Sequence, residues 1–203
     1  LYNYPGWSNP DLKPETGMNY EVGANHQLLE KVAGSISFYF LQMKDEIWID
    51  PATWATKNLG KTNHIGSELE ISGEVTDGLS CKLGYAWQNA IFASGDNKDN
   101  TLTLIPRNKV TLQANYVTDF GPVAGFQVDS MGKRYTDETN DYSIDGYTLV
   151  SLNFGWHWKM VELWSKITNL FDTQYVECGF GGAFGNFVYP GAGRTLQAGI
   201  RLR

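Results

Sequence analysis

Apolar and polar residues alternate along most of the chain. From Met18 to Gln27, apolar side chains take the even positions as far as Ala24, and polar side chains or glycine take the odd positions. A period of two over this length predicts a β-strand with one apolar and one polar face. The same alternation recurs in segments 65–75, 79–88, 110–116, 150–158 and 196–203.

Three further segments alternate less regularly. Segment 35–49 loses its pattern near Gln42, where we expect a β-bulge. Segment 123–135 alternates only around its middle, and segment 161–169 is mixed. Counting these with the regular segments, we predict an all-β chain of about nine up-and-down antiparallel strands.

The connections between these strands fall into two classes of length. Short turns are predicted at 30–34, 76–78, 119–122 and 159–160, and long loops at 51–61, 95–103, 137–145 and 176–191. The two classes alternate along the chain, so they gather at opposite ends of the strands. This segregation, with aromatic residues such as Trp87 and Trp156 near strand ends, predicts a transmembrane β-barrel with short periplasmic turns and long extracellular loops. It argues against the alternative of a soluble carbohydrate-binding sandwich.

The alternation assigns a direction to each side chain of such a barrel. We expect the polar set to line the lumen, namely Glu68, Glu70, Gln113, Asn115, Ser151 and Asn153. We expect the apolar set to face lipid, namely Leu69, Ile71, Leu83, Tyr85, Leu112, Val150, Leu152 and Phe154. An acid/base pair of Glu68 and Glu70 is the alternative, but it requires a convergent cleft and separated pKa values.

Composition and charge narrow the classes of function. No apolar run approaches the ~20 residues of a membrane-spanning helix, and the mean hydropathy is −0.33. The net charge of −6 argues against nucleic acid as a partner, because DNA binding needs a basic surface. The histidines are scattered without the spacing of zinc ligands, so we predict no metal site. No constellation of nucleophile and base points to an enzyme.

Several short motifs follow one another in a fixed order. They are Asn9-Pro10-Asp11-Leu12-Lys13-Pro14-Glu15 with Tyr20-Glu21-Val22-Gly23, then Gly66-Ser67-Glu68-Leu69-Glu70, Pro106-Arg107-Asn108-Lys109, Asn169-Leu170-Phe171-Asp172 with Tyr175, and Tyr189-Pro190-Gly191 with Gly193-Arg194-Thr195. Each motif alone is weak. Their order over residues 1–203 resembles the C-terminal part of the β-barrel of TonB-dependent outer-membrane receptors.

The resemblance implies a barrel of about 22 strands in a Gram-negative outer membrane, plugged by an N-terminal domain. It implies active import of a scarce nutrient, above all a ferric siderophore that itself holds the iron, powered by the TonB complex and without a cofactor. Cobalamin, haem or an oligosaccharide are alternative cargoes, and a passive porin is an alternative type of barrel. The plug, the TonB box and further strands are expected outside residues 1–203, and an aromatic residue is expected to follow Arg203.

Aromatic residues in the predicted loops are candidates for ligand contact. Phe180, Phe184 and Phe187 are interleaved with glycines in the last long loop, and Trp54 lies in the first. Rigid rings at the mouth of a barrel can meet a ligand at low entropic cost. The alternative interpretation of the Gly-rich stretch is a flexible surface loop.

The two cysteines are not expected to pair with each other. Cys81 follows a predicted short turn, whereas Cys178 lies in a predicted long loop at the other end of the strands. The apolar band between those ends is about 25 Å tall, and a disulfide tolerates a Cα separation of only about 7 Å.

Overall fold

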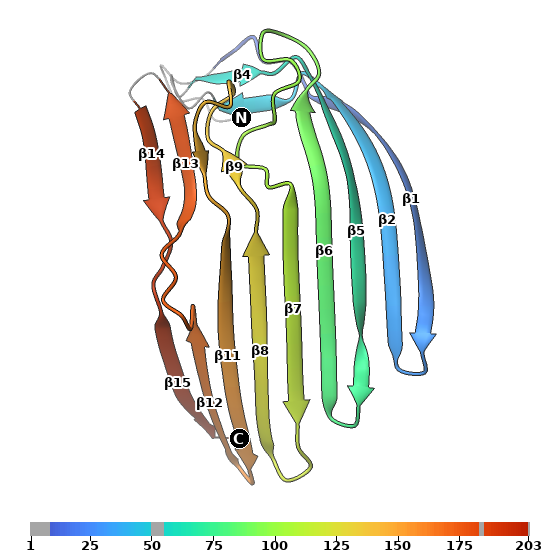
Figure 1. The fold of residues 1–203 in the computed structure, drawn as a ribbon, viewed down its shortest axis with the longest axis vertical. Helices are drawn as coiled ribbons and strands as arrows, with labels where there is room; N and C mark the ends of the chain where they lie inside the picture. Colours follow the sequence, from blue (N-terminus) through green and yellow to red (C-terminus); the bar gives the residue numbers. More distant parts are fainter. Residues whose placement is uncertain (1–8, 50–54, 183–184, 203) are drawn as a thin grey trace.

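The computed structural model describes residues 9–49, 55–182 and 185–202, and they form one large antiparallel sheet (Figure 1). The sheet has nine strands in the order β1-β2-β5-β6-β7-β8-β11-β12-β15. These strands are β1 (Thr16–Leu29), β2 (Val32–Lys44), β5 (Lys61–Thr76), β6 (Leu79–Phe92), β7 (Asn108–Val117), β8 (Pro122–Met131), β11 (Tyr147–Trp158), β12 (Val161–Thr168) and β15 (Thr195–Leu202). Spatial order follows chain order, which confirms the predicted up-and-down arrangement.

Three small hairpins lie within the long connections. They pair β3 (Ile47–Ile49) with β4 (Thr56–Asn58), β9 (Arg134–Tyr135) with β10 (Ser143–Ile144), and β13 (Val176–Gly182) with β14 (Gly185–Pro190). All three lie toward one end of the sheet, and the short turns lie at the other (Figure 1). The predicted segregation of long and short connections is therefore confirmed.

The predicted bulge near Gln42 is wrong. β2 pairs with β5 without a shift from Val32 to Lys44, so the ladder runs straight through this position. The pattern breaks instead at Asp45, whose φ of 57° lies in the left-handed region and ends the strand. The alternation fades at Gln42 because the strand there leaves the apolar zone, not because its register changes.

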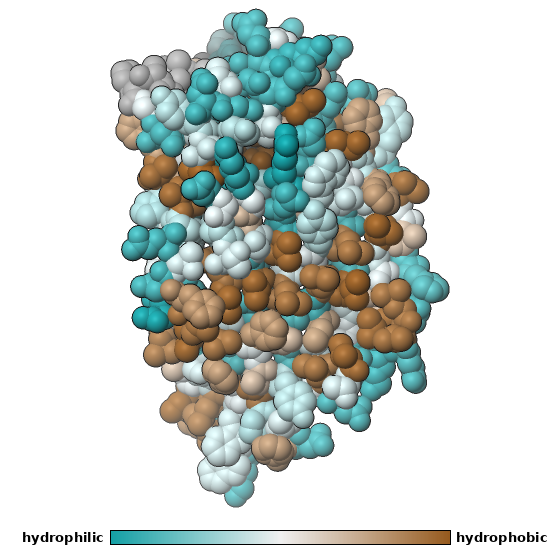
Figure 2. All heavy atoms as spheres, in the orientation of Figure 1, coloured by the Kyte–Doolittle hydropathy of each residue, from teal (hydrophilic) through white to brown (hydrophobic). Residues whose placement is uncertain are grey.

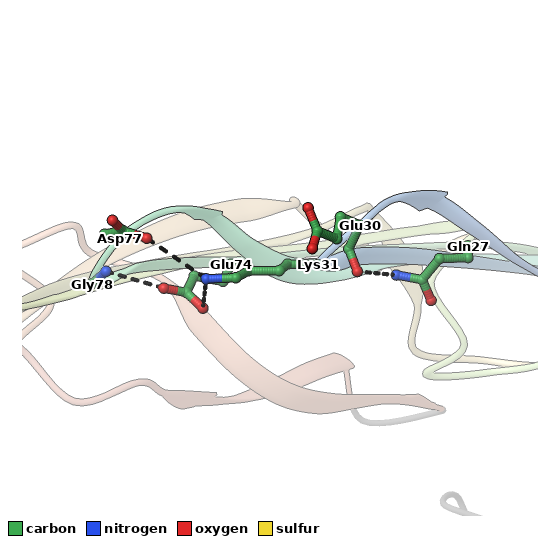
Figure 3. A network of polar contacts seen from close by, with 6 residues as sticks. All are labelled: Gln27, Glu30, Lys31, Glu74, Asp77 and Gly78. Atoms are coloured by element: carbon green, nitrogen blue, oxygen red, sulfur yellow. Dashed lines mark hydrogen bonds and ion pairs between the residues drawn. The ribbon is translucent and has the colours of Figure 1, made fainter.

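A polar network joins two neighbouring short turns (Figure 3). The Lys31 ammonium lies 3.1 Å from a carboxylate oxygen of Glu74, and the backbone N–H of Glu74 donates to the Lys31 carbonyl at 3.0 Å. The other Glu74 oxygen accepts from the Gly78 N–H at 3.2 Å. Hydrogen bonding to Glu74 raises the pKa of Lys31. The turn after β1 and the turn after β5 are thus held side by side.

The sheet has one apolar and one polar face. Directly opposed residues share a face, so the register shows each set as a ladder across the strands. One apolar ladder is Val150, Val128, Leu112, Leu83 and Ile71; the neighbouring polar ladder is Ser151, Gln127, Gln113, Lys82 and Ser72. Figure 2 shows an apolar band across the middle of the molecule, with hydrophilic residues above it.

Burial is concentrated at the long-loop end of the sheet and is sparse elsewhere. A small core of Leu59, Ala90, Phe92 and Leu102 is buried there, with Trp48 partly buried against it. Apolar side chains of the strands are mostly open, as at Val22, which is 69% exposed. A single sheet with an open apolar face requires another apolar phase to cover it. Among the described residues, no helix is long and apolar enough to cross a membrane.

The two cysteines lie in different parts of the molecule, and both thiols are free. Cys81 is in β6, close to the short turn after β5, and it pairs in register with Ala114. Cys178 is in β13, within the hairpin at the long-loop end.

Candidate functional site

The long loops are bonded to one another rather than standing apart. Glu138, in the loop after β8, is a central member of this network. Its carboxylate lies 2.9 Å from the Lys57 ammonium and accepts from the Asn97 amide at 3.1 Å. Its carbonyl accepts from the Asn100 amide at 3.0 Å. One residue thereby connects the loops that follow β2, β6 and β8.

The tip of the loop after β8 is folded around the buried Asp137 carboxylate. This group accepts the backbone N–H of Asp141 at 3.0 Å and that of Tyr142 at 2.7 Å, as well as the Thr139 hydroxyl. Such side-chain-to-backbone bonds fix a tight turn without a regular strand. The loop is therefore a defined scaffold, which we call the hub loop (residues 132–146).

The hub loop also holds the hairpin β13–β14. The buried Arg134 guanidinium donates to the carbonyls of Glu177 at 2.6 Å and Val176 at 3.0 Å. The Thr136 hydroxyl donates to the Asn186 side chain at 3.0 Å, and the Thr136 carbonyl accepts from the Gly181 N–H at 2.8 Å. All four long connections consequently form one bonded cap.

An apolar pocket of about 410 Å³ opens within this cap. It is lined by Ile47, Trp48, Ile49, Thr103, Leu104, Thr136, Gly179 and Phe180. Two buried polar atoms of its lining, Nε1 of Trp48 and Oγ1 of Thr103, have no hydrogen-bond partner among the described residues. A pocket of aromatic and aliphatic walls with a few polar groups is the usual form of a small-molecule site.

The predicted ligand-contact residues are only partly covered by the structure. Phe180 lies in the wall of the pocket, with its ring edge-on to that of Tyr189 at a centroid distance of 5.5 Å. Phe187 is opposite Phe180 in the hairpin ladder and is 57% exposed. Phe184 and Trp54 lie outside the described residues. On either side of residues 183–184, the Gly-rich stretch is paired as a β-hairpin.

The carboxylate of Glu46, which has a lowered pKa, lies where the first long loop leaves the sheet. The Glu46 carboxylate accepts the Thr62 hydroxyl at 2.7 Å and lies 3.8 Å from Nε2 of His64. Hydrogen bonding to His64, helped by Thr62, lowers the pKa of Glu46 despite its partial burial. The ionised form of Glu46 therefore fastens this loop to β5.

The residues predicted to line a lumen lie together on the polar face. Glu70 forms an ion pair with Lys82 at 2.8 Å. Asn115 and Asn153 approach each other over Gly125, where a Cβ atom would collide with both side-chain amides. Glu68 and Glu70 also line a groove of about 430 Å³ on this face. Across the described parts of the chain, no three His, Cys, Asp or Glu residues are grouped as metal ligands.

Sequence reasoning missed the hub loop. Glu138 and Asn140 lie in segment 137–145, which was expected only to be a long loop, and Arg134 was assigned to the strand segment 123–135, although β8 ends at Met131. The signal present was the run from Asp137 to Asp141, because Asp, Thr and Asn favour side-chain-to-backbone turns. Which other loop each side chain would bond could not be derived from that run.

A wide antiparallel sheet with an apolar outer band, short turns at one end and a cap of loops at the other defines an outer-membrane β-barrel wall. The chain belongs to the TonB-dependent receptor-like β-barrel family, whose model matches residues 1–170. Barrels of this family reside in the outer membrane, and the family consists of receptors and transporters.

Relatives of known name are similar over nearly the whole chain. The "Ferrioxamine receptor" of Yersinia enterocolitica is 31% identical over 97% of this chain and 29% of its own length. The "Vitamin B12 transporter BtuB" of Vibrio vulnificus is 28% identical over 98% of this chain and 32% of its own. The chain thus spans about a third of the length of such relatives.

Solved structures show the same fold. The ferric yersiniabactin uptake receptor FyuA of Yersinia pestis superposes with a TM-score of 0.80, over 93% of this chain and 30% of that one, at 22% identity. The ferric citrate transporter FecA in its unliganded form superposes with a TM-score of 0.77, over 93% and 31%, at 20% identity.

Proposed function

We propose that this chain forms part of the wall and the outer mouth of an active importer in the outer membrane, and that its cargo is a ferric siderophore. The observation that carries the proposal is family membership, combined with a relative named for ferrioxamine that is similar over 97% of this chain. Import of this kind is transport without covalent chemistry, so the proposal assigns no catalytic role to any residue.

The cap of long loops is the proposed capture site. Its pocket offers aromatic walls at Trp48 and Phe180 and aliphatic walls at Ile47 and Leu104. An iron complex surrounded by an organic chelator presents apolar edges, which such a lining suits. Phe187 adds an exposed ring beside this wall, and Phe184 and Trp54 are proposed as further contacts.

The polar face is the proposed wall of the lumen and contacts a plug domain. Glu68, Glu70, Gln113, Asn115, Ser151 and Asn153 supply carboxylates, amides and a hydroxyl that can bond a folded domain inside the barrel. Polar interiors are the rule in such barrels. The edge strands β1 and β15 are bonded on one side only among the described residues. In lipid, such edges must be paired, so we propose that further strands of the same barrel flank them.

Cobalamin is a second candidate cargo. The relative named as a vitamin B12 transporter matches 98% of this chain at 28% identity, which is close to the match of the ferrioxamine receptor. A passive porin is disfavoured, because the family is one of receptors and transporters that depend on TonB.

A growth experiment distinguishes these possibilities. A strain deleted for the gene is compared with its parent under iron limitation, with single ferric siderophores as the iron source, and in a cobalamin-dependent background with limiting cobalamin. Failure to grow on one siderophore, restored by the intact gene, supports siderophore import. A growth defect seen only with limiting cobalamin supports cobalamin as the cargo. If the deletion strain grows normally under every condition, both candidate cargoes are refuted.

A further inference from the structure

Two lysines face each other on the apolar side of the sheet. Lys44, the last residue of β2, is directly opposite Lys61, the first residue of β5. Directly opposed side chains have Cβ atoms about 5 Å apart, and like charges in this position are destabilising. Neither ammonium group has a carboxylate partner within ion-pairing distance among the described residues.

This position is exceptional within the sheet. The register places Lys44 and Lys61 in one ladder with Thr16, on the face that carries the apolar band. The neighbouring ladder of the same face is Met18, Gln42 and Asn63. All other lysines and arginines of the nine described strands lie on the polar face, namely Lys82, Lys109, Lys166 and Arg201. Two unpaired charges on an otherwise uncharged outer wall suggest a bound anion.

The surroundings form a shallow groove rather than a bare surface. A cavity of about 340 Å³ is lined by Thr16, Gly17, Met18, Gln42, Met43, Lys44, Lys61 and Asn63. The Gln42 amide lies 3.4 Å from the Asn63 oxygen, so hydrogen-bonding groups stand beside the two ammonium groups. Immediately toward the turns, Met18, Tyr20 and Val22 are each more than half exposed. The groove is therefore cationic at one end and apolar at the other.

The height of the groove matches the outer surface of a bilayer. From His26, near the turn after β1, to Thr16, opposite Lys44, the strand rises by about 33 Å. At the usual tilt of about 40°, this corresponds to a vertical distance of about 25 Å, which is the height of the apolar band of such barrels. Lys44 and Lys61 then stand at the level of the headgroups of the outer leaflet.

We propose that this groove binds the phosphate-bearing headgroup of an anionic lipid in the outer leaflet. Lys44 and Lys61 hold the phosphate, Gln42 and Asn63 donate hydrogen bonds to it, and the acyl chains lie along Met18, Tyr20 and Val22. Two cations that repel each other in the empty groove are both neutralised by one phosphate group. The inference depends on the barrel sitting in the outer membrane and is independent of the cargo.

Native mass spectrometry of the intact receptor in a non-ionic detergent tests the proposal. Short-chain phosphatidic acid is titrated, with phosphatidylcholine of the same chain length for comparison and inorganic phosphate as a competitor. The test variant is Lys44→Gln/Lys61→Gln. The matched control is Lys13→Gln/Lys98→Gln, which removes two exposed loop lysines. A Lys44→Arg/Lys61→Arg variant keeps the charge and checks that the strands still fold.

The parent, the control and the arginine variant are expected to bind phosphatidic acid more tightly than phosphatidylcholine. The glutamine variant is expected to bind phosphatidic acid on the order of tenfold more weakly, with phosphatidylcholine unaffected. Equal binding of phosphatidic acid by parent and glutamine variant overturns the proposal. Displacement of the lipid by inorganic phosphate at equal concentration also overturns it, because the site then recognises a free anion and not a lipid.

Discussion

Asn140 and Thr101 join two long loops by a reciprocal pair of hydrogen bonds. The Thr101 N–H donates to Oδ1 of Asn140 at 2.8 Å, and the Asn140 amide donates to the Thr101 carbonyl at 2.9 Å. Thr101 is only 5% exposed, so water competes poorly for these groups. Asn140 has a φ of 65°, a left-handed conformation that asparagine tolerates better than most residues. This pair fixes the loop after β6 against the hub loop.

Replacing Asn140 by aspartate is expected to loosen both loops. Asn140→Asp keeps the size, the acceptor oxygen and the tolerance for positive φ, but it removes the amide donor. The Thr101 carbonyl is then left without this partner, at a cost of about 1–3 kcal/mol. Hydrogen–deuterium exchange on the intact receptor should quicken in peptides covering 97–103 and 137–142. Asp96→Asn, at an exposed position of the same loop, is the control, and unchanged exchange in both peptides would contradict the prediction.

An arginine at Leu152 is expected to impair insertion. Leu152 lies between Phe126 and Ile167 on the apolar face, near the middle of the band. A lipid-facing arginine at the bilayer midplane costs about 2–4 kcal/mol. The abundance of folded receptor in outer membranes should therefore fall for Leu152→Arg. The same substitution at Ser151, one residue away on the polar face, should be tolerated better, and equal losses for both would show that the two faces are assigned wrongly.

Acidic pH is expected to release the first long loop from the sheet. The pKa of Glu46 is lower in the folded chain than in the unfolded chain, so its stabilising effect is complete above the ordinary pKa of a glutamate. This stabilisation is lost as the pH falls through the lowered folded-state pKa. Hydrogen exchange in residues 45–49 and 55–60, corrected for its intrinsic pH dependence, should rise in that acidic range. Glu46→Gln should remove the transition, whereas Glu30→Gln, in an exposed short turn, should leave it in place.

Loss of the two described ring contacts is expected to weaken cargo capture. Phe180→Ala/Phe187→Ala removes a wall of the pocket and the exposed ring opposite it, so uptake of the cargo at low concentration should fall several-fold. Receptor abundance should stay unchanged, because neither ring belongs to the nine-stranded sheet. Phe120→Ala, in a short turn at the far end, serves as the control. Normal uptake by the double variant would show that hairpin β13–β14 is not part of the capture site.

The sheet could be predicted from the sequence because alternation is a local and repeated signal. Each strand has one face toward apolar and one face toward polar surroundings, so an atypical residue at a single position does not hide the pattern. For this reason segment 123–135 could be assigned as a strand although its alternation is weak. The strand ends were less certain. At Gln42 the apolar alternation stops because the surroundings become polar, and in the sequence this looks the same as a shift of strand register. The unbroken pairing of β2 with β5 and the left-handed backbone of Asp45 show that the register does not shift.

The bonded cap could not be predicted in the same way. The contacts of Glu138 with Lys57 and Asn97 join residues 81 and 41 positions apart along the chain, and no periodicity relates them. The two terminal nitrogens of the buried Arg134 guanidinium donate to backbone carbonyl groups of a distant hairpin, and such contacts leave no signature in side-chain type. The aromatic residues of the loops could be identified as candidates, but not the pocket that Phe180 shares with Trp48.

The bonded cap also has a thermodynamic consequence. Because the hub loop already fixes its neighbours through Arg134, Glu138 and Asn140, the described part of the mouth is preorganised, and little of its backbone freedom remains to be lost when a ligand arrives. Binding calorimetry should then show a heat-capacity change that reflects only the apolar surface covered in the pocket, without the larger signature of a segment that folds upon association. An Asn140→Asp receptor, whose loops have to be ordered anew, should bind the same ligand with a less favourable entropy.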